Sequence, residues 1–259
     1  MKKVLLEVKA LKVSYDKNVV IENMNLTLRE GEFVALLGLN GSGKTTLLKA
    51  ICGLHKSDSG SCIVDGMNGL IMNERNRSRL MSYVPQRNSV IYSISVLDVV
   101  LMGFNPRLTI FKSPGRSERE MATKVLKRLG ISEMADDNFL NLSEGQKQLV
   151  ILARAMVQDT PIMLFDEPDS ALDFVNKHMV LDKIRNTIHD DGRCGLITLH
   201  DPNYALGYCD RIVLLSSGGV CGEIIVKNAT RSSVEETLSK IYGDIEVIEN
   251  RDSYVMVRA

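Results

Sequence analysis

Residues 33–53 read FVALLGLNGSGKTTLLKAICG, and this stretch decides the fold. The apolar run at 33–37 predicts a strand buried on both faces, as in a parallel sheet. Apolar residues at helical spacing over 47–54 predict a helix that ends near Gly53. Between strand and helix, residues 38–45 match the pattern GxxxxGK[ST]. The stretch therefore predicts a strand, a phosphate-binding loop (the P-loop, residues 38–45) and a helix in direct succession.

The P-loop residues have chemical roles that fit a nucleoside triphosphate. Glycines let backbone N–H groups turn toward the phosphates, and the helix N-terminus adds positive potential. Lys44 can reach the β and γ phosphates, and the Thr45 hydroxyl can bind Mg²⁺. A glycine-rich turn with a surface lysine would also match the bare pattern, but the flanking strand and helix argue against it. The expected nucleotide-binding residues here are Gly38, Asn40, Gly41, Ser42, Gly43, Lys44, Thr45 and Thr46.

Two adjacent carboxylates follow a second apolar strand. Asp166 and Glu167 come directly after Ile162–Phe165. Asp166 would hold Mg²⁺ opposite the P-loop, and Glu167 could orient and deprotonate the attacking water. A solvated acidic strand end is the alternative interpretation of this pair.

The rest of the chain indicates an α/β fold interrupted by helices. Segments 5–15 and 21–30 alternate like half-buried antiparallel strands, and apolar runs at 161–165, 194–199 and 211–215 predict further strands of a parallel sheet. Ser95 with Asp98, and Ser117 with Glu120, predict two helix starts in the middle of the chain. We therefore expect a P-loop NTPase (RecA-like) core with an N-terminal antiparallel β subdomain and an inserted α-helical subdomain. The expected division of this single domain, 1–259, is 1–86 and 155–225 for the β subdomain and core, 87–154 for the helical insert and 226–259 for a short C-terminal extension.

Composition excludes several classes of protein. Of 259 residues 44% are hydrophobic, enough for a sizeable core, and 32 basic residues balance 32 acidic ones. A neutral chain gives no electrostatic reason to expect nucleic acid as a partner. Five scattered cysteines without a CxxC pair fit a cytosolic protein with reduced thiols. Neither a signal-peptide core nor a run of 18 apolar residues is present, so we expect a chain that stays in the cytosol and does not span a bilayer.

Further short motifs occur along the chain in a fixed order. The order is Tyr15 before the P-loop, Gln86 after Tyr83–Pro85, the segment LSEGQ at 142–146 (the signature segment), SALD at 170–173 (the D-loop) and His200 after an apolar strand. Ser143 and Gln146 also form a capping box, so that Ser143 and Gly145 would present amides and a hydroxyl at a helix N-terminus. With these motifs in this order, the chain resembles the ATP-binding cassette (ABC) family over nearly its whole length.

The resemblance implies an ATPase whose site is shared between two subunits. Each ATP would lie between the P-loop of one copy and the signature segment of a second copy, in a head-to-tail dimer. In this arrangement Tyr15 stacks on adenine, Gln86 senses the γ-phosphate and Mg²⁺, and Asp173 links the two sites. The implied catalytic residues are Glu167, His200 and Lys44; Ser143, Gly145 and Gln146 also bind the nucleotide, and Mg²⁺ would be held by Thr45, Gln86 and Asp166.

Longer phrases resemble one branch of the family. They are SVLDVVLMGFNPRL (95–108), LFDEPDSALDF (164–174), LHDPNYALGYCDRIVLLSSGGV (199–220) and IYGDIEVIENRDSYVMV (241–257). Their likeness implies a motor for uptake of an iron chelate (siderophore), haem or cobalamin. The implied partners are transmembrane permease subunits and, indirectly, an external substrate-binding protein, and the implied place is the cytoplasmic face of the inner membrane.

Four other functions remain as alternatives. A zinc or manganese importer and an exporter would use the same motor. An ABC ATPase acting on DNA or ribosomes usually has two cassettes or a long coiled coil, which this sequence does not show. A P-loop GTPase needs an NKxD guanine reader, and residues 176–179 read NKHM without the Asp.

Three positions depart from the family's usual motifs. Leu39 stands where Pro is common, Glu144 where Gly is usual, and Asp169 where Thr is common. Leu39 adds a backbone donor and should be harmless. We expect Glu144 to point away from the γ-phosphate, because an inward carboxylate would repel it.

Overall fold

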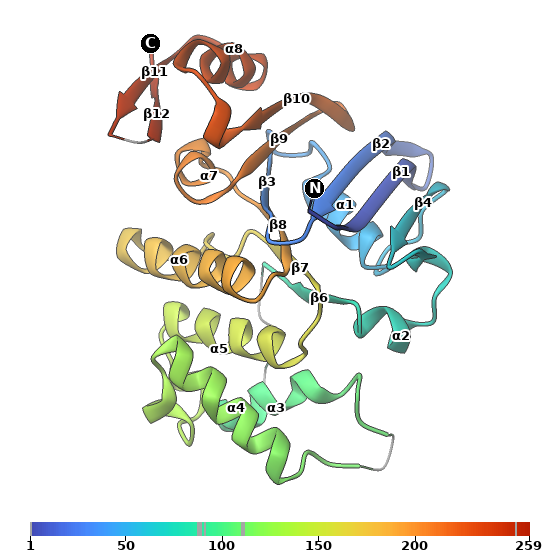
Figure 1. Ribbon diagram of the computed structural model, residues 1–259, viewed down its shortest axis with the longest axis vertical. Coiled ribbons are helices and arrows are strands. Elements are labelled where there is room, and N and C mark those ends of the chain that lie inside the picture. Colours follow the sequence, from blue (N-terminus) through green and yellow to red (C-terminus); the bar gives the residue numbers. More distant parts are fainter. Residues whose placement is uncertain (1, 87–89, 91, 110–111, 252) are drawn as a thin grey trace.

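The computed structural model describes residues 2–86, 90, 92–109, 112–251 and 253–259. Its N-terminal part is a four-stranded antiparallel sheet in the order β2-β1-β4-β5 (Figure 1). The strands are β1 (Val4–Tyr15), β2 (Asn18–Arg29), β4 (Ser59–Val64) and β5 (Met67–Asn68). The expected half-buried antiparallel strands at the start of the chain are thus confirmed.

The second sheet has six strands in the order β10-β9-β3-β8-β7-β6. Five of them are parallel, and β10 pairs with β9 in the antiparallel direction. They are β3 (Phe33–Leu37), β6 (Met81–Val84), β7 (Ile162–Asp166), β8 (Cys194–Thr198), β9 (Arg211–Ser216) and β10 (Gly219–Ile225). The apolar runs identified from sequence form β3, β7, β8 and β9, which confirms the predicted α/β fold.

Each face of the six-stranded sheet belongs to a different hydrophobic core. Along β3, Phe33, Ala35 and Leu37 enter one core, whereas Val34 and Leu36 enter the other. This alternation follows from the two-residue period of a strand. Because both faces are covered, β3 is buried at all five positions, which explains its unbroken apolar sequence.

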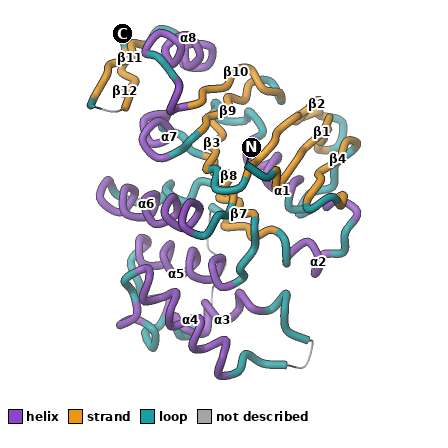
Figure 2. Tube along the Cα trace, in the orientation of Figure 1, coloured by secondary structure: helices purple, strands orange, loops and turns teal. Residues whose placement is uncertain are grey.

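The helices divide between these faces (Figure 2). One face packs against α1 (Lys44–Ile51) and the antiparallel sheet. The other is covered by α5 (Glu144–Val157), α6 (Phe174–Asp190), α7 (Pro202–Tyr208) and α8 (Arg231–Tyr242), and α3 (Val96–Leu101) and α4 (Arg116–Leu129) pack against α5 in the same core. A short helix, α2 (Glu74–Ser78), precedes β6. The P-loop helix and the signature helix α5 are consequently on opposite faces of the sheet.

Helix starts in the middle of the chain follow the sequence with one exception. Ser95 accepts a hydrogen bond from the backbone N–H of Asp98 and caps α3 as expected. The expected start at Ser117 is wrong, because α4 begins at Arg116 after Gly115. The carboxylate of Glu118 accepts from the Gly115 N–H at 2.8 Å, so the helix begins two residues earlier than expected and Ser117 lies in its first turn.

The C-terminal residues form α8 and a hairpin of β11 (Ile245–Asn250) and β12 (Ser253–Arg258). Figure 1 shows the hairpin beside α7, at the end of the molecule far from α4. The Asn203 side chain on α7 donates to and accepts from the backbone of Met256 at 3.2 and 2.7 Å. The hairpin is thereby fastened to the helix that follows His200.

Gly103 gives a test of the packing between helices. It lies in a 3-10 turn, Met102–Phe104, and an added Cβ would stand 2.2 Å from the Arg154 carbonyl oxygen on α5. We expect Gly103→Ala to lower the free energy of unfolding by about 1–3 kcal/mol, because this overpacking must push the turn off α5. Urea denaturation measures the change.

Gly207 on α7 is the matched control, because its added Cβ meets nothing within 4 Å. Gly207→Ala should be neutral or stabilising by up to about 1 kcal/mol. Equal effects of the two substitutions would contradict the close helix contact at Gly103.

Candidate functional site

Four neighbouring strands of the parallel sheet carry predicted site residues just past their carboxyl ends. Gly38 follows β3, Gln86 lies two residues after β6, Glu167 follows β7 and His200 lies two residues after β8. Since parallel strands end at the same edge, these residues gather there, and this edge is where open α/β sheets bind ligands. Residues far apart in sequence therefore form one site.

The P-loop needs glycine at two positions. A Cβ on Gly38 would stand 2.5 Å from both the Leu215 carbonyl oxygen and Ser42 Oγ, so a side chain cannot fit. Gly43 has φ of 96° and caps the N-terminus of α1. The loop is thus wound tightly from the end of β3 into the helix.

The interior of the P-loop presents a cation and a buried hydroxyl. Lys44 Nζ donates to the carbonyl oxygens of Gly38 and Leu39 at 2.8 and 3.3 Å. Burial lowers the pKa of Lys44, and the nearby carboxylates of Glu167 and Asp166 oppose that shift. Ser42 Oγ is buried without a hydrogen-bond partner within the described part of the chain. An unsatisfied donor beside a lysine and a helix N-terminus suits an anion.

Asp166 accepts hydrogen bonds from three hydroxyl groups of the site. Thr45 and Thr198 donate their hydroxyls to its Oδ1 at 2.8 and 3.1 Å, and Tyr83 donates to its Oδ2 at 2.9 Å. Burial, followed by the Asp166 charge, raises the pKa of Tyr83, so the phenol remains a donor at neutral pH. Thr45 Oγ1 and the Asp166 carboxylate, placed this close, are hard oxygen ligands of the kind that Mg²⁺ prefers.

Glu167 is held between Gln86, which is predicted to sense the γ-phosphate, and His200, a predicted catalytic residue. Gln86 Nε2 donates to Glu167 Oε2 at 2.5 Å, and His200 Nε2 lies 2.8 Å from Oε1. The Glu167 N–H donates to Thr198 Oγ1 at 2.8 Å. Its φ of 46° lies in the left-handed region, which costs roughly 1–3 kcal/mol for a residue with a side chain. Backbone strain of this kind is concentrated at functional sites.

The signature segment begins α5 with the expected capping box. Gln146 N–H donates to Ser143 Oγ at 3.3 Å, and Ser143 N–H donates to Gln146 Oε1 at 2.9 Å. Gly145 packs against Asn176 on α6, where a Cβ would lie 2.8 Å from the amide oxygen. Asp173 of the D-loop caps α6 by accepting from the Asn176 N–H at 2.9 Å. The signature segment and D-loop therefore meet at the N-termini of two helices.

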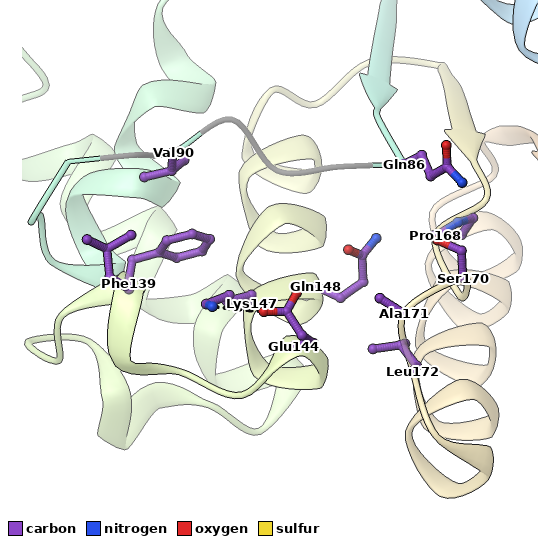
Figure 3. A pocket seen from close by; sticks show the side chains of 11 residues that line it. Gln86, Val90, Phe139, Glu144, Lys147, Gln148, Pro168, Ser170, Ala171 and Leu172 are labelled. Atoms are coloured by element: carbon purple, nitrogen blue, oxygen red, sulfur yellow. Dashed lines mark hydrogen bonds and ion pairs between the residues drawn. The ribbon is translucent and has the colours of Figure 1, made fainter.

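A groove separates α5 from the D-loop (Figure 3). Gln86 lies at one end of it, Glu144 and Gln148 line the α5 side, and Ser170 and Leu172 line the D-loop side. No P-loop residue lines this groove. The signature helix α5 and the P-loop helix α1 belong to cores on different faces of the sheet, so the two predicted phosphate-binding elements are separated within one chain.

The three unusual motif residues have different surroundings. Leu39 is exposed, and its harmlessness stays a prediction. Glu144 is bonded to Lys147 at 2.8 Å, one turn along α5, so a cation accompanies its charge; its orientation relative to a γ-phosphate stays a prediction. Asp169 is buried, and its Oδ2 lies 3.7 Å from Lys177 Nζ. Burial raises the pKa of the Asp169 carboxyl.

Sequence reasoning missed two residues of the site, Tyr83 and Thr198. Tyr83 lies three residues before Gln86, and Thr198 two residues before His200. A signal was available, because residues at the carboxyl ends of strands next to β7 must lie beside Asp166 in a parallel sheet. Tyr15, the predicted adenine contact, lies at the end of β1 with its side chain 43% exposed.

Comparisons with known proteins agree on one family. Residues 21–170 match the family described as ABC transporter. The chain is 35% identical over 215 residues to a probable iron chelatin transport ATP-binding protein of Helicobacter pylori, covering 82% of this chain and 83% of that protein. It is 34% identical over 257 residues to a hemin import ATP-binding protein of Shewanella denitrificans, covering 96% and 98% of the two chains.

Solved structures share the fold. A metal-chelate type ABC transporter in an inward-facing conformation superimposes with a TM-score of 0.83 at 27% identity, covering 98% of this chain and 96% of that one. The ATP-binding cassette MJ0796, in a dimeric post-hydrolysis state bound to ADP and Pi, gives a TM-score of 0.76 at 27% identity, covering 87% and 100%. The similarity thus extends from the sequence to nearly the whole fold.

Ser42 provides a test of the P-loop as an anion site. Its buried hydroxyl has no described partner, so Ser42→Ala should raise the free energy of unfolding without nucleotide by about 1 kcal/mol. The same change should weaken ATP binding by about tenfold, because a donor to the phosphates is lost. Thermal unfolding and calorimetric titration measure the two effects.

Ser82→Ala is the control, because Ser82 is also buried but its Oγ already accepts from Thr160 at 3.1 Å. That variant should lose stability and retain ATP affinity. A Ser42→Ala protein that binds ATP like the wild type would exclude Ser42 from phosphate binding.

Proposed function

Because this chain belongs to the ABC transporter family and is an ATP-binding subunit that hydrolyses ATP, we propose that it powers import of an iron chelate, haem or cobalamin through a membrane permease. Two relatives are named for transport of iron chelatin and import of hemin, and a similar structure is a metal-chelate type transporter. The phrases at 95–108 and 199–220 favour the same branch. Neutral net charge argues against a role on DNA or ribosomes.

The observation that carries the proposed chemistry is Glu167 held between Gln86 and His200 beside the P-loop. The P-loop amides, Ser42 and Lys44 would bind the phosphates and offset their charge. Glu167 would then orient a water and take its proton, with His200 in contact with the γ-phosphate. ATP is the substrate, and the products are ADP and phosphate.

Residues that fit Mg²⁺ lie next to Lys44. Thr45 Oγ1 and Asp166 Oδ1 are 2.8 Å apart, and the Gln86 side-chain oxygen would be a third ligand. When bound, Mg²⁺ supplies charge neutralisation to the β and γ phosphates. The hydrogen bond from Gln86 to Glu167 uses Nε2, so the side-chain oxygen of Gln86 is left for this role.

We assign the second half of each nucleotide site to a second copy of the chain. The P-loop helix and α5 pack on opposite faces of the sheet, and Ser143, Gly145 and Gln146 therefore need a P-loop from outside. A head-to-tail pair with ATP between the subunits satisfies both halves, and Asp173 would connect the two sites. Dimeric structures of a similar ATP-binding cassette support this arrangement.

The proposed place of the chain is the cytoplasmic face of the inner membrane, bound to permease subunits that receive cargo from an external binding protein. In the described residues, no helix is both long enough and apolar enough to cross a membrane. Attachment would use the proposed helical insert, 87–154, and the Gln86 loop.

The experiment that tests the proposed function is purification of the tagged chain from gently solubilised native membranes, with untagged membranes as control. Mass spectrometry should identify a many-span permease with an external binding protein, and the ligand of that protein names the cargo. A permease without a binding protein would contradict import and favour export. Ribosomal or DNA-repair partners without a membrane protein would contradict the transport role.

Glu167→Gln tests the general base. The amide keeps the size of the side chain but cannot accept a proton, so kcat for ATP hydrolysis should fall by about 10² to 10⁴-fold while ATP binding persists. Phosphate release and nucleotide titration measure the two properties. The exposed Glu133→Gln should have normal turnover, and normal turnover in Glu167→Gln would remove Glu167 from this role.

Gln86→Ala tests coupling to the permease. The side chain would contact Mg²⁺ and the γ-phosphate, while its loop faces the partner. We expect ATP binding to remain, but the stimulation of ATPase activity by the reconstituted permease should fall by about tenfold, the scale of one hydrogen bond to a charged group. Loss of nucleotide binding would instead mean that Gln86 is mainly structural.

A further inference from the structure

The ring of Tyr15 is already stacked on one side. His55 lies with its ring centroid 4.2 Å from that of Tyr15, and the two planes are inclined by 35°. In this tilted arrangement the imidazole lies over part of one face of the Tyr15 ring. Because the Tyr15 side chain remains 43% exposed, the rest of the ring is accessible from solvent.

His55 is held by hydrogen bonds of both its side chain and its backbone. Its Nε2 lies 3.2 Å from the carbonyl oxygen of Ser14, the residue before Tyr15. A carbonyl oxygen only accepts, so Nε2 carries the proton in this hydrogen bond. The N–H groups of Leu54 and His55 both donate to the Lys49 carbonyl oxygen at the end of α1, at 2.8 and 3.1 Å. The imidazole therefore bridges the end of the P-loop helix and the end of β1.

The stacked pair lies next to the phosphate-binding loop. Tyr15 pairs with Asn18 at the turn between β1 and β2. Val20 and Ile21 follow Asn18 along β2. The Val20 carbonyl oxygen and Ile21 Cδ1 would stand 3.2 and 2.6 Å from a Cβ on Gly43. The hairpin end that carries Tyr15 thus packs against the P-loop.

We propose that His55 is a positioning residue for nucleotide binding, which holds the Tyr15 ring by stacking so that its free face receives the adenine base. This inference rests on the proposed function, because it requires Tyr15 to contact the base. His55 covers one face of the ring, restricts its rotation and leaves a preorganised platform. A side chain held in its bound orientation loses less entropy when the ligand arrives.

The test compares a ligand that has a base with one that does not. ADP and inorganic pyrophosphate, each with Mg²⁺, are titrated into the full chain by isothermal calorimetry. In His55→Ala the Kd for ADP should rise by about 3- to 10-fold, on the scale of one aromatic pair, while the Kd for pyrophosphate stays unchanged. His55→Phe should restore ADP affinity, because it keeps a ring for stacking. Lys56→Ala, at the exposed next position, is the matched control and should bind both ligands normally.

Each other outcome has a defined meaning. An unchanged ADP affinity in His55→Ala, or tighter ADP binding because His55 covers the face that the base uses, would overturn the proposal. Equal weakening of ADP and pyrophosphate would also overturn it, since His55 would then act through the fold of α1. A Tyr15→Ala variant with wild-type ADP affinity would refute the base contact itself. A folded wild-type chain that binds neither ligand would instead contradict the proposed function.

Discussion

The site depends on one buried carboxylate, Asp166, and the three hydroxyls that bind it. Thr45 comes from α1, Tyr83 from β6 and Thr198 from β8, so this one side chain joins the P-loop helix to strands on both sides of β7. A buried charge is tolerated only when it is well hydrogen-bonded, and three hydroxyl donors meet that requirement. Thr198 also accepts from the backbone N–H of Glu167. The proposed metal ligands and the proposed base are therefore held by one network.

The two faces of the parallel sheet impose the second constraint. Because β3 alternates its side chains between two cores, α1 and α5 are separated by the sheet itself. Each helix presents an N-terminus suited to phosphate, and we propose that two chains complete the site around each nucleotide. In this proposal the nucleotide is part of the contact between two subunits. ATP binding would then favour association and hydrolysis would remove that contribution, which can drive a movement in an attached permease.

Local patterns predicted much of the fold and of the candidate site. The apolar run of β3, the P-loop and the capping box at Ser143 depend on residues close in sequence. Such local patterns can be recognised from a single sequence. Tyr83 and Thr198 could not be placed so easily, because their partner Asp166 is set by strand order. The start of α4 was misplaced because Glu118 offered a better partner to the backbone than the expected Ser117 cap. His55 lies outside any motif, and only the fold brings its ring onto Tyr15.

The most direct measurement is the mass of the Glu167→Gln chain in solution, followed by light scattering as ATP is added with Mg²⁺. The account predicts a shift from monomer to dimer with ATP and a monomer with ADP. The same chain with the additional change Ser143→Arg, which blocks the signature segment, should remain monomeric. A monomer at saturating ATP, or a dimer that forms equally well with Ser143→Arg, would contradict the claim that the nucleotide site is completed by a second copy.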